Sequence, residues 1–480
     1  MRICFVSSEV HPFAKTGGLA DVSAALCKRL HRLGHDVRLF TPAYGSIGEP
    51  SALLPPGEIE LQAAGRPLRL TLREGRLADS DLRVYLIACP ELYDRGAIYT
   101  DDPDEAVRFA MLARTAIESC RRTAWAPDIF HCHDWHPALI PVYLNGPYRS
   151  DPLFQRSKTV LTIHNLGYQG VFPARVLRDI GLADHAHLLH GDDLRRGRIG
   201  FLKSGILHAD AITTVSPTYA REIRTPEYGF GLHEILAARS ASLTGILNGV
   251  DYDEWSPERD RHIPYRYSAE TLHDKESNKR SLLERLSVAE GPEGPLFGIV
   301  SRLAYQKGFD LCFDVLPDLL SRPNLRLVVL GAGEARYESF FEALERRFPA
   351  RVRFHRGHNE TLAHWIEAGC DFFLMPSRYE PCGLNQMYSL RYGTIPIVRK
   401  TGGLADTVRP FDRVSGTGTG FVFEHFTSDG LRWAMETALS VLEDDRAWEK
   451  IRRNAMAEDF SWDRQVHSYE ALYRRVLDAP

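Results

Sequence analysis

One heptapeptide occurs twice in this 480-residue chain. Lys-Thr-Gly-Gly-Leu-Ala-Asp stands at residues 15–21 and again at 400–406, each time after a strand-like apolar run and before a segment that can open a helix. A Gly-Gly turn at a helix start brings backbone N–H groups close to a ligand, the helix dipole favours an anion there, and lysine adds a mobile positive charge. The repeat predicts two phosphate- or sugar-facing loops. An ordinary strand-to-helix turn is the alternative for a single copy, and two identical copies weaken it.

A second pattern places two cations after a strand. Ser-Arg-Leu-Ala-Tyr-Gln-Lys-Gly at 301–308 follows the apolar run 296–300, so Arg302 and Lys307 leave the carboxyl end of a strand into a loop closed by glycine. An arginine fork and a lysine point charge can neutralise the charge that develops on a diphosphate leaving group. The alternative is a pair of solvated surface cations.

A third motif, Pro-Ser-Arg-Tyr-Glu-Pro-Cys-Gly-Leu-Asn-Gln at 376–386, also follows an apolar strand. Its proline and glycine shape a turn into a helix start, which exposes the N–H groups of Cys382, Gly383 and Leu384. Glu380 would accept hydrogen bonds from sugar hydroxyls. We interpret the cysteine as a small packing residue rather than a nucleophile, because no histidine neighbours it and no cysteine-enzyme signature surrounds it.

The run His-Cys-His-Asp-Trp-His at 131–136 ends another predicted strand. His131 and His133 would share one face of that strand, so a metal site is conceivable. The spacing matches neither the helical H-E-x-x-H motif nor the zinc-finger patterns, and a site must also supply ligand number and geometry. We therefore expect a polar cluster that lines the binding site for an acceptor.

A further strand ends in Thr-Ile-His-Asn-Leu-Gly-Tyr-Gln-Gly at 162–170. His164 in this run could face a reacting sugar. The competing interpretation is a structural histidine whose ring nitrogens are satisfied within the protein.

The elements that must position these motifs alternate regularly along both halves of the chain. Apolar runs of strand length alternate with helical periods such as 19–33 and 106–122, which indicates βαβ units on parallel sheets. The predicted strands are 2–7, 37–41, 84–88, 129–132, 159–164 and 211–215 in the first half, and 296–300, 325–330, 352–354, 372–375, 394–398 and 420–423 in the second. The expected fold class is α/β, with two Rossmann-like doubly wound domains.

A shift in composition marks the domain boundary. Turn residues crowd 245–257 and a polar, charged stretch follows to about 295, so we place an N-terminal domain at 1–245 and a C-terminal domain at 246–456. The tail 457–480 carries an amphipathic helix that would pack back on the first domain. Because open α/β sheets bind ligands at the carboxyl ends of their strands, we expect a phosphate-bearing ligand in a cleft between the domains.

Composition narrows the function classes. Hydrophobic residues make up 44% and charged residues 25%, and the net charge of −4 argues against a broad nucleic-acid surface. None of the eight cysteines forms a C-x-x-C pair, which argues against a zinc or redox framework. With no signal-peptide pattern and no apolar run of membrane-spanning length, we expect a cytoplasmic protein without membrane or nucleic-acid partners.

Together these motifs resemble the bacterial glycogen synthases and the plant starch synthases, in matching order and over essentially the whole chain. The resemblance implies a GT-B fold, that is, two Rossmann-like domains, a deep interdomain cleft and a C-terminal helix that returns to the first domain. It implies transfer of glucose from ADP-glucose to the non-reducing end of an α-1,4-glucan, glycogen or a malto-oligosaccharide, with retention of configuration. It implies no metal and no other cofactor.

The resemblance also implies roles for residues of the first domain, which would serve as the acceptor side. The implied contacts are Lys15, Gly17, Gly18 and, in a supporting role, Asp21 at the donor, His164 with Asn165 beside the glucose, and Asp134 near the acceptor.

In the second domain, on the donor side, Arg302 and Lys307 would stabilise the ADP leaving group and Glu380 would bind glucose hydroxyls. Backbone groups of Cys382, Gly383 and Leu384, and of Thr401, Gly402, Gly403 and Leu404, would help hold sugar and phosphate.

Two positions depart from related patterns. Retaining GT-B enzymes often carry a second glutamate eight residues after the first, and here that position is Tyr388, as is common in the glycogen synthase branch. Bacterial relatives usually have an adenine-stacking tyrosine where His358 stands, and imidazole offers a smaller stacking face. A donor with UDP instead of ADP therefore remains an alternative.

Three further functions would each have a distinct signature. A glycogen phosphorylase would need a lysine-bound pyridoxal phosphate, visible by absorbance. A silent glucan-binding protein on the same fold would be expected to lack the cations at 302 and 307. A dehydrogenase would need G-x-G-x-x-G, but after Gly331 and Gly333 the third position is Arg336.

Overall fold

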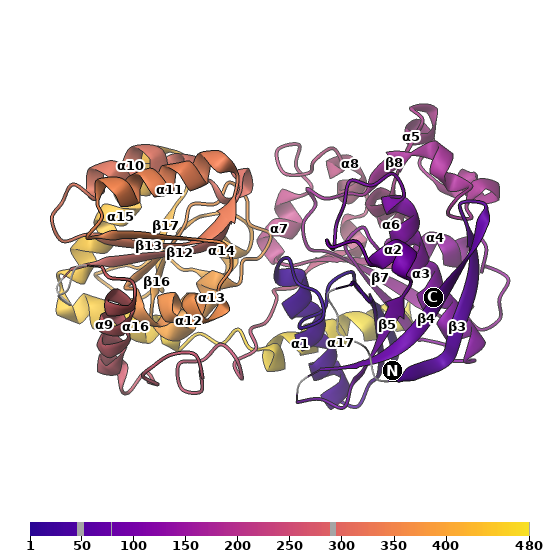
Figure 1. Cartoon of the computed structure of the whole chain (residues 1–480), viewed down its shortest axis with the longest axis horizontal. Coiled ribbons are helices and arrows are strands. Elements are labelled where there is room, and N and C mark those ends of the chain that lie inside the picture. The colour runs from indigo at the N-terminus through magenta and orange to yellow at the C-terminus, as the bar shows by residue number, and fades with distance from the viewer. Residues whose placement is uncertain (46–51, 78, 289–293, 480) are drawn as a thin grey trace. The chain divides into compact units, whose positions relative to one another are not determined.

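The computed structural model describes residues 1–45, 52–77, 79–288 and 294–479. These residues form two compact units, one of Met1–Gly249 with Trp462–Pro480 and the other of Val250–Ser461 (Figure 1). The composition shift places the boundaries a few residues earlier, after 245 and 456. The chain enters the second unit at Val250 and leaves it after Ser461. These two segments are hydrogen-bonded within that unit, where the Val250 N–H donates to the Phe460 carbonyl at 2.8 Å.

A mixed sheet forms the centre of the first unit. Within the described residues it has nine strands in the order β11-β10-β7-β6-β1-β2-β5-β4-β3. Its parallel strands are β1 (Arg2–Val6), β2 (Asp36–Pro42), β5 (Arg83–Ala88), β6 (Ile129–His133), β7 (Lys158–Ile163), β10 (Ala211–Thr214) and β11 (Leu243–Gly245). All six strands predicted for the first half are confirmed.

The expectation of a purely parallel sheet is wrong at one edge. Strands β3 (Leu53–Ala63) and β4 (Arg66–Arg76) form an antiparallel hairpin, and β4 also pairs antiparallel with β5. The hairpin turns through Ala64 and Gly65, both with positive φ, which is the backbone that a tight two-residue hairpin requires. No crossover helix is needed there, because antiparallel neighbours can be joined directly.

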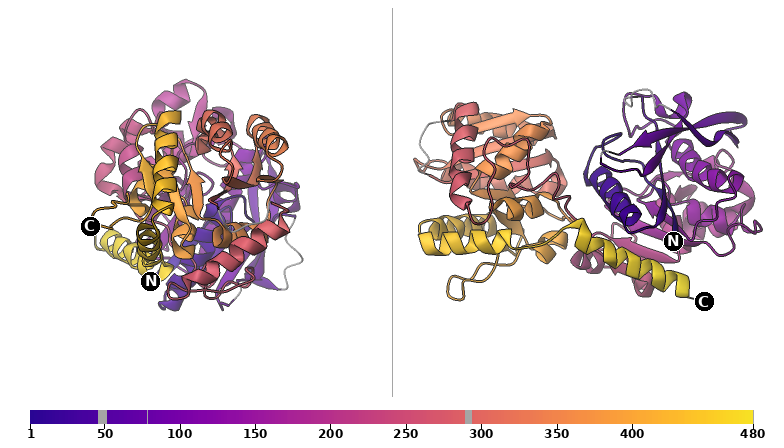
Figure 2. Two further views of the ribbon diagram at one scale, coloured as in Figure 1. Left: turned by 90° about the vertical axis from the view of Figure 1, so that its left-hand side faces the viewer. Right: turned by 90° about the horizontal axis from the view of Figure 1, so that it is seen from below.

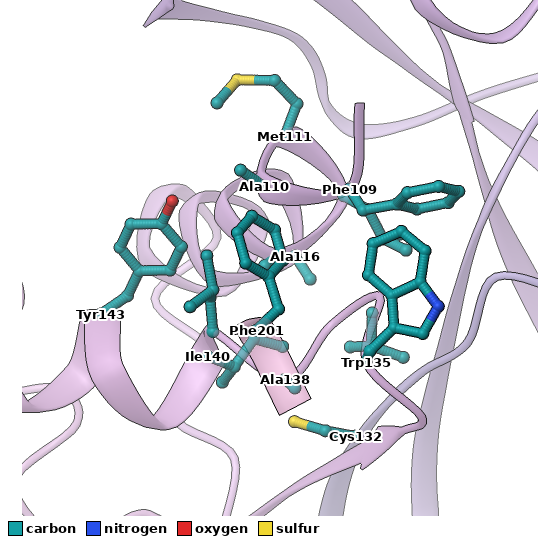
Figure 3. Close-up of a cluster of buried hydrophobic side chains, with 14 of the residues drawn as sticks. Phe109, Ala110, Met111, Ala116, Cys132, Trp135, Ala138, Ile140, Tyr143 and Phe201 are labelled. Atoms are coloured by element: carbon teal, nitrogen blue, oxygen red, sulfur yellow. The ribbon is translucent and has the colours of Figure 1, made fainter. Parts of the chain in front are cut away.

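Helices cover this sheet and complete its core. They are α1 (Gly18–Arg32), α2 (Pro90–Tyr93), α3 (Glu105–Arg122), α4 (Ile140–Asn145), α5 (Gly191–Arg195), α6 (Phe201–His208), α7 (Pro217–Glu222) and α8 (His233–Ala238), with a small second sheet of β8 (Val171–Pro173) and β9 (Arg198–Gly200). In one core cluster, Trp135 packs edge-on against Phe109 of α3, while Phe201 of α6 and Tyr143 of α4 lie nearby (Figure 3).

The C-terminal tail forms the predicted helix, α17 (Trp462–Asp478), which belongs to the first unit. Its buried residues recur every three or four positions and join the core beside α1. Arg29 of α1 pairs with Asp463 at 3.1 Å, and Figure 2 shows the helix running to the C-terminus. The Tyr473 hydroxyl reaches Nδ1 of His131 at 2.7 Å, which ties the tail to β6.

The second unit is built on a parallel sheet with strand order β14-β13-β12-β15-β16-β17 among its described residues. The strands are β12 (Leu296–Leu303), β13 (Arg326–Gly333), β14 (Val352–Arg356), β15 (Phe372–Met375), β16 (Ile395–Arg399) and β17 (Phe421–Phe423), so every strand predicted for the second half is confirmed.

Helices cover both faces of this sheet. Figure 1 shows α10 (Cys312–Leu319) and α11 (Ala335–Arg347) on one side, and α9 (Lys275–Arg285), α12 (Glu360–Gly369) and α16 (Asp445–Met456) on the other. The unit also contains α13 (Asn385–Tyr392), α14 (Gly402–Thr407) and α15 (Ser428–Leu442). In the described part of the chain, no helix combines the length and apolarity needed to cross a membrane.

Both sheets contain a point at which the strand order reverses. In the first unit the chain moves outward from β1 to β2 and later returns to β6 on the other side of β1. In the second it moves from β12 to β13 and returns to β15. Loops on the two sides of such a switch point diverge at the carboxyl ends of the strands and leave a crevice where open α/β sheets bind ligands.

Candidate active site

In the second unit, the switch point carries the ion pair of Lys307 and Glu380. Lys307 follows β12 and Glu380 follows β15, the two strands on either side of the reversal. The Lys307 Nζ lies 2.6 Å from Glu380 Oε2, and the Ser377 hydroxyl donates to the same oxygen at 3.0 Å. The glutamate is buried, whereas the lysine side chain is 19% exposed. The two motifs that the sequence singled out separately therefore form one cluster.

Close backbone packing holds the two loops of this cluster together. The turn that contains Lys307 ends at Gly308, whose φ is 69° and whose position for a Cβ lies only 2.1 Å from the carbonyl oxygen of Pro376. The Arg378 N–H donates to the Gln306 carbonyl at 2.9 Å. Only glycine fits a position with both this backbone conformation and this contact, so the sequence of the turn fixes the lysine beside the glutamate.

The second heptapeptide packs beneath the Glu380 loop. Thr401, Gly402 and Gly403 are all buried, and the Gly403 N–H donates to the carbonyl of Glu380 at 3.0 Å. That donor is used within the protein, and the role implied for residues 401–404 in holding phosphate stays a prediction. Lys400 is also directed elsewhere, since it pairs at the surface with Glu424 at 2.6 Å.

Arg302 and His358, the other side chains predicted in this unit, are both exposed but differ in whether a neighbouring side chain contacts them. Arg302 is exposed, and its guanidinium makes no hydrogen bond or ion pair to any residue that the structure describes. His358 is also exposed and lies 3.3 Å from a carboxylate oxygen of Glu360. Arg302 lies in the last residues of β12, and His358 follows the carboxyl end of β14 in the same sheet.

The peptide groups expected to bind sugar lie between Glu380 and α13. Cys382 is buried, consistent with a packing role, while Gly383 and Leu384 are half-buried. The Gln386 side-chain amide donates to the carbonyls of Cys382 at 3.0 Å and Gly383 at 2.9 Å. The first turn of α13 therefore fixes this loop.

In the first unit, the first heptapeptide is held by a residue that we did not predict, Glu9. Its carboxylate accepts hydrogen bonds from the Thr16 N–H at 2.5 Å, the Thr16 hydroxyl at 2.7 Å and the Gly17 N–H at 3.2 Å. Tyr99 donates to it at 2.6 Å. A buried carboxylate thus binds the Gly17 amide, and the donor contacts implied for Gly17 and Gly18 stay predictions. Glu9 lies just after β1, at the switch point of the first sheet, and that position is the sequence signal that could have identified it.

Lys15 is partly exposed beside this loop. Its ammonium group pairs with the Asp21 carboxylate at 3.0 Å, and each side chain is about 30% exposed. Gly18 begins α1, the helix on which Asp21 lies. The heptapeptide therefore carries its own counter-charge for the lysine, which gives Asp21 a positioning role toward Lys15.

Asp134 directly follows β6, the strand on the other side of the switch point from β2. Its φ of 59° turns the chain sharply after β6, and the buried Trp135 anchors that turn in the core. Its Oδ1 accepts from the N–H groups of His164 at 2.7 Å and Asn165 at 3.4 Å. Burial raises the pKa of the Asp134 carboxyl to about 7, although these hydrogen bonds oppose the rise. Asp134 thus joins the ends of β6 and β7.

His164 lies at the end of β7 in contact with a second histidine. Its Nε2 is 2.9 Å from Nδ1 of His133, and burial lowers the pKa of His164 to about 3. His164 is half-buried and His133 fully buried. The ring of His164 is therefore neutral near pH 7 and oriented by its neighbour.

The histidines of the 131–136 run do not line a binding surface, contrary to our expectation. His131, His133 and His136 are all buried. His131 is held between the Tyr473 hydroxyl and the Thr162 hydroxyl, each at 2.7 Å. Burial lowers the pKa of His131 to about 3. These are neutral core histidines, and only Asp134 of this run remains a candidate for a substrate contact.

Comparisons with known proteins agree with this arrangement. Residues 2–238 match the family model for the starch synthase catalytic domain, and residues 284–455 match that for glycosyl transferases group 1. The chain is 44% identical to a glycogen synthase of Koribacter versatilis over 480 residues, covering 99% of this chain and 98% of that protein. It is 45% identical to a glycogen synthase of Anaeromyxobacter dehalogenans over 481 residues, covering 99% of each.

A solved structure gives the same result. The chain matches the catalytic domain of starch synthase IV from Arabidopsis thaliana, bound to ADP and acarbose, with a TM-score of 0.92 and 34% identity, over 100% of this chain and 99% of that one. Fold and sequence thus define a two-domain α/β glycosyltransferase with a GT-B fold. More specifically, the chain belongs to the glycogen synthase and starch synthase family.

Proposed function

We propose that this protein is a glycogen synthase that transfers glucose from ADP-glucose to the non-reducing end of an α-1,4-glucan, with retention of configuration and release of ADP. The observation that carries the proposal is the Lys307–Glu380 pair at the switch point of the second sheet. A lysine held there by a buried carboxylate offers a fixed positive charge for a diphosphate. The ADP and acarbose in the related starch synthase structure support the choice of donor and acceptor.

The donor-side chemistry is mainly electrostatic. Arg302, exposed and without a described ion-pair partner, and Lys307 would neutralise the phosphate charge as ADP departs. In a front-face reaction, the departing phosphate takes the proton of the attacking glucan hydroxyl while positive charge develops on the glucose ring. Glu380 keeps its other carboxylate oxygen for a glucose hydroxyl. No metal or other cofactor enters this proposal.

Residues of the first unit would position the sugar. His164 would contact the glucose as a neutral ring, in keeping with its lowered pKa, and Asn165 lies next to it. Asp134 would act on the acceptor side by fixing the backbone of His164. Lys15, restrained by Asp21, would add positive charge near the donor. The eight free cysteines, all buried, suit a reducing compartment, and we propose that the enzyme acts in the cytoplasm.

His358 is the residue that would contact the base of the donor nucleotide. His358 is 77% exposed and would present an imidazole face to adenine, where a larger aromatic ring would bind more strongly. A UDP-sugar donor is therefore the second candidate. A catalytically silent glucan-binding protein is the candidate from another class.

Radiolabelled ADP-glucose and UDP-glucose, each offered with glycogen and without added metal, test the proposal. Incorporation of glucose from ADP-glucose alone is the expected result. Preferential incorporation from UDP-glucose would move the protein to the alternative donor class. Glycogen binding without incorporation from either donor would identify a silent binding protein.

A further inference from the structure

A cluster of metal-ligand side chains lies in the second unit, apart from the Lys307–Glu380 pair. Glu360 begins α12 and His364 follows one turn later, so the two side chains share one face of the helix. Glu254 comes from the segment that enters this unit. One ligand atom from each of the three lies within 4.8 Å of the others, and no other such group occurs among the described residues.

The imidazole of His364 supplies a second, independent observation. The ring is completely buried, and its Nε2 has no hydrogen-bond partner in the described part of the chain. The nearest carboxylate oxygen, Oε1 of Glu360, is 3.8 Å away, which is too long for a hydrogen bond. A buried ring nitrogen without a partner is costly, and here it is directed at the carboxylate cluster.

The opposite side of the ring is fully supported. Nδ1 of His364 lies 2.8 Å from Oδ2 of Asp260, itself completely buried, and Trp255 stacks on the ring with centroids 3.7 Å apart. Histidines that bind zinc through one ring nitrogen usually donate the N–H of the other nitrogen to a carboxylate in this way. The ring is thus oriented before any ion binds.

The donor set selects the class of ion. Mg²⁺ and Ca²⁺ prefer oxygen ligands alone, whereas one imidazole and two carboxylates suit Zn²⁺. Zinc–ligand distances of about 2.0–2.2 Å place neighbouring ligand atoms of a tetrahedral ion about 3.4 Å apart. The widest separation in the cluster, up to 4.8 Å, must therefore contract by about 1.4 Å. Glu254 and Glu360 are only half-buried, so their side chains have room to move.

We propose that Glu254, Glu360 and His364 bind one Zn²⁺ ion, with Asp260 orienting the histidine and water completing the coordination. The second oxygen of Glu360 already lies 3.3 Å from His358. An ion would thus fix the start of α12 and the loop before it. None of the three ligands is itself assigned to the proposed glucosyl transfer, and the contact of Glu360 with His358 is the one link between the zinc site and the proposed adenine contact.

The test uses the full-length protein after removal of metal with EDTA. Isothermal titration with Zn²⁺ should give one ion per chain, and Co²⁺ should give the visible absorption of a tetrahedral complex. Zinc should also raise the thermal unfolding midpoint, since an ion that binds only the folded state stabilises it.

Single carboxylate variants decide whether the ion occupies this cluster. Glu254→Gln and Glu360→Gln should each weaken zinc binding more than about 10-fold. Asp253→Asn removes the same charge from the neighbouring residue, an exposed partner of Arg259, and should bind as the wild type does. Failure of the wild type to bind zinc, or equal binding by Glu254→Gln and Asp253→Asn, would overturn the proposal.

Discussion

The amide of Gly403 donates a 3.0 Å hydrogen bond to the carbonyl oxygen of Glu380. The neighbouring Gly402 has a φ of 44°, and a Cβ on it would lie 1.9 Å from the same oxygen. The second heptapeptide thus supports the loop that carries the glutamate. The first copy differs, because a Cβ on Gly17 would meet nothing within 4 Å. The same heptapeptide is therefore packed tightly against a neighbouring loop in the second unit and loosely at Gly17 in the first.

This contrast predicts different effects of alanine at equivalent positions. Gly402→Ala should lower the free energy of unfolding by about 1–3 kcal/mol through steric conflict, and should reduce kcat/KM about 100-fold because the Glu380 loop is displaced. Gly17→Ala should change the unfolding free energy by about 0.5 kcal/mol or less. Urea unfolding and initial rates measure both effects. Equal destabilisation by the two variants would contradict this description of the repeat.

The Lys307–Glu380 pair allows its catalytic and structural contributions to be separated. Lys307→Ala should reduce turnover at least about 100-fold. It should also cost about 1–3 kcal/mol of stability, because it leaves a buried carboxylate without its cation. Adding Glu380→Gln removes that charge, so the double variant should regain stability while turnover stays low. Recovery of turnover in the double variant would show that the lysine serves only to neutralise the glutamate.

Glu9 is expected to act on substrate binding through the heptapeptide loop. Glu9→Gln replaces one acceptor oxygen by an amide NH₂ that faces N–H and O–H donors, so the loop loses about one charge-assisted hydrogen bond. The KM for ADP-glucose should rise about 10-fold with a smaller change in kcat. Glu91→Gln, at an exposed ion pair with Arg66, is the matched control and should leave KM unchanged. An unchanged KM with a lowered melting temperature would leave Glu9 a purely structural role.

Strand and helix positions followed from the sequence because each parallel strand is a short apolar run between helical periods. The same rule placed Lys307 and Glu380 at strand ends. The hydrogen bonds that this rule does not predict include one between residues that lie far apart in the sequence. The bond of His131 to Tyr473 spans 342 positions. The amides of the heptapeptides are satisfied by Glu9 and by a backbone carbonyl. The place of Glu9 after β1 marks it as a switch-point residue, but no local pattern pairs it with residues 16 and 17.

The edge hairpin was missed for a different reason. Leu68, Leu70 and Leu72 of β4 are buried and alternate with more exposed residues, which is the pattern of a half-buried strand. Continuous apolar runs are typical of central parallel strands, whereas an edge hairpin is marked by this period of two and by a Gly-containing turn.

The buried histidines predict a loss of stability in acid. The pKa of His131 is about 3 in the folded protein and about 6.5 when unfolded, so the unfolded chain binds more protons between these values. Stability is therefore retained above pH 6.5 and lost as the pH falls from there toward 3, by about 1.4 kcal/mol per pH unit for this residue. Asp134, with its pKa raised to about 7, acts in the opposite direction between about pH 4 and 7.

Urea unfolding at pH 7.5, 6.5 and 5.5 measures this dependence. His131→Gln should be less stable than the wild type at neutral pH. Below pH 6.5, its free energy of unfolding should depend less steeply on pH, by the equivalent of about one proton taken up on unfolding. The exposed His187→Gln should keep the wild-type slope. An unchanged slope in His131→Gln would mean that this histidine is not held neutral by the fold.

The bond between His133 and His164 predicts which nitrogen of His164 carries its proton. Nε2 of His133 is buried without a partner among the described residues. A bare lone pair at that position costs less than an unpaired N–H, so His133 should carry its proton on Nδ1 and donate it to Nε2 of His164. His164 would then hold its own proton on Nδ1 and offer a donor from that atom. Nitrogen-15 NMR of labelled histidine measures the tautomer directly.

Two substitutions test whether this tautomer matters for the reaction. Asn at position 133 places an amide N–H near the original Nδ1, so His133→Asn should keep the tautomer of His164 and most of the turnover. His133→Phe fills the space without a donor, and should lower kcat at least about 10-fold with a shift in the nitrogen-15 signals of His164, since a hydrogen bond of about 1.5 kcal/mol is lost. If both variants lose turnover equally, packing alone explains His133. If neither does, the proton on His164 is set by something other than this bond.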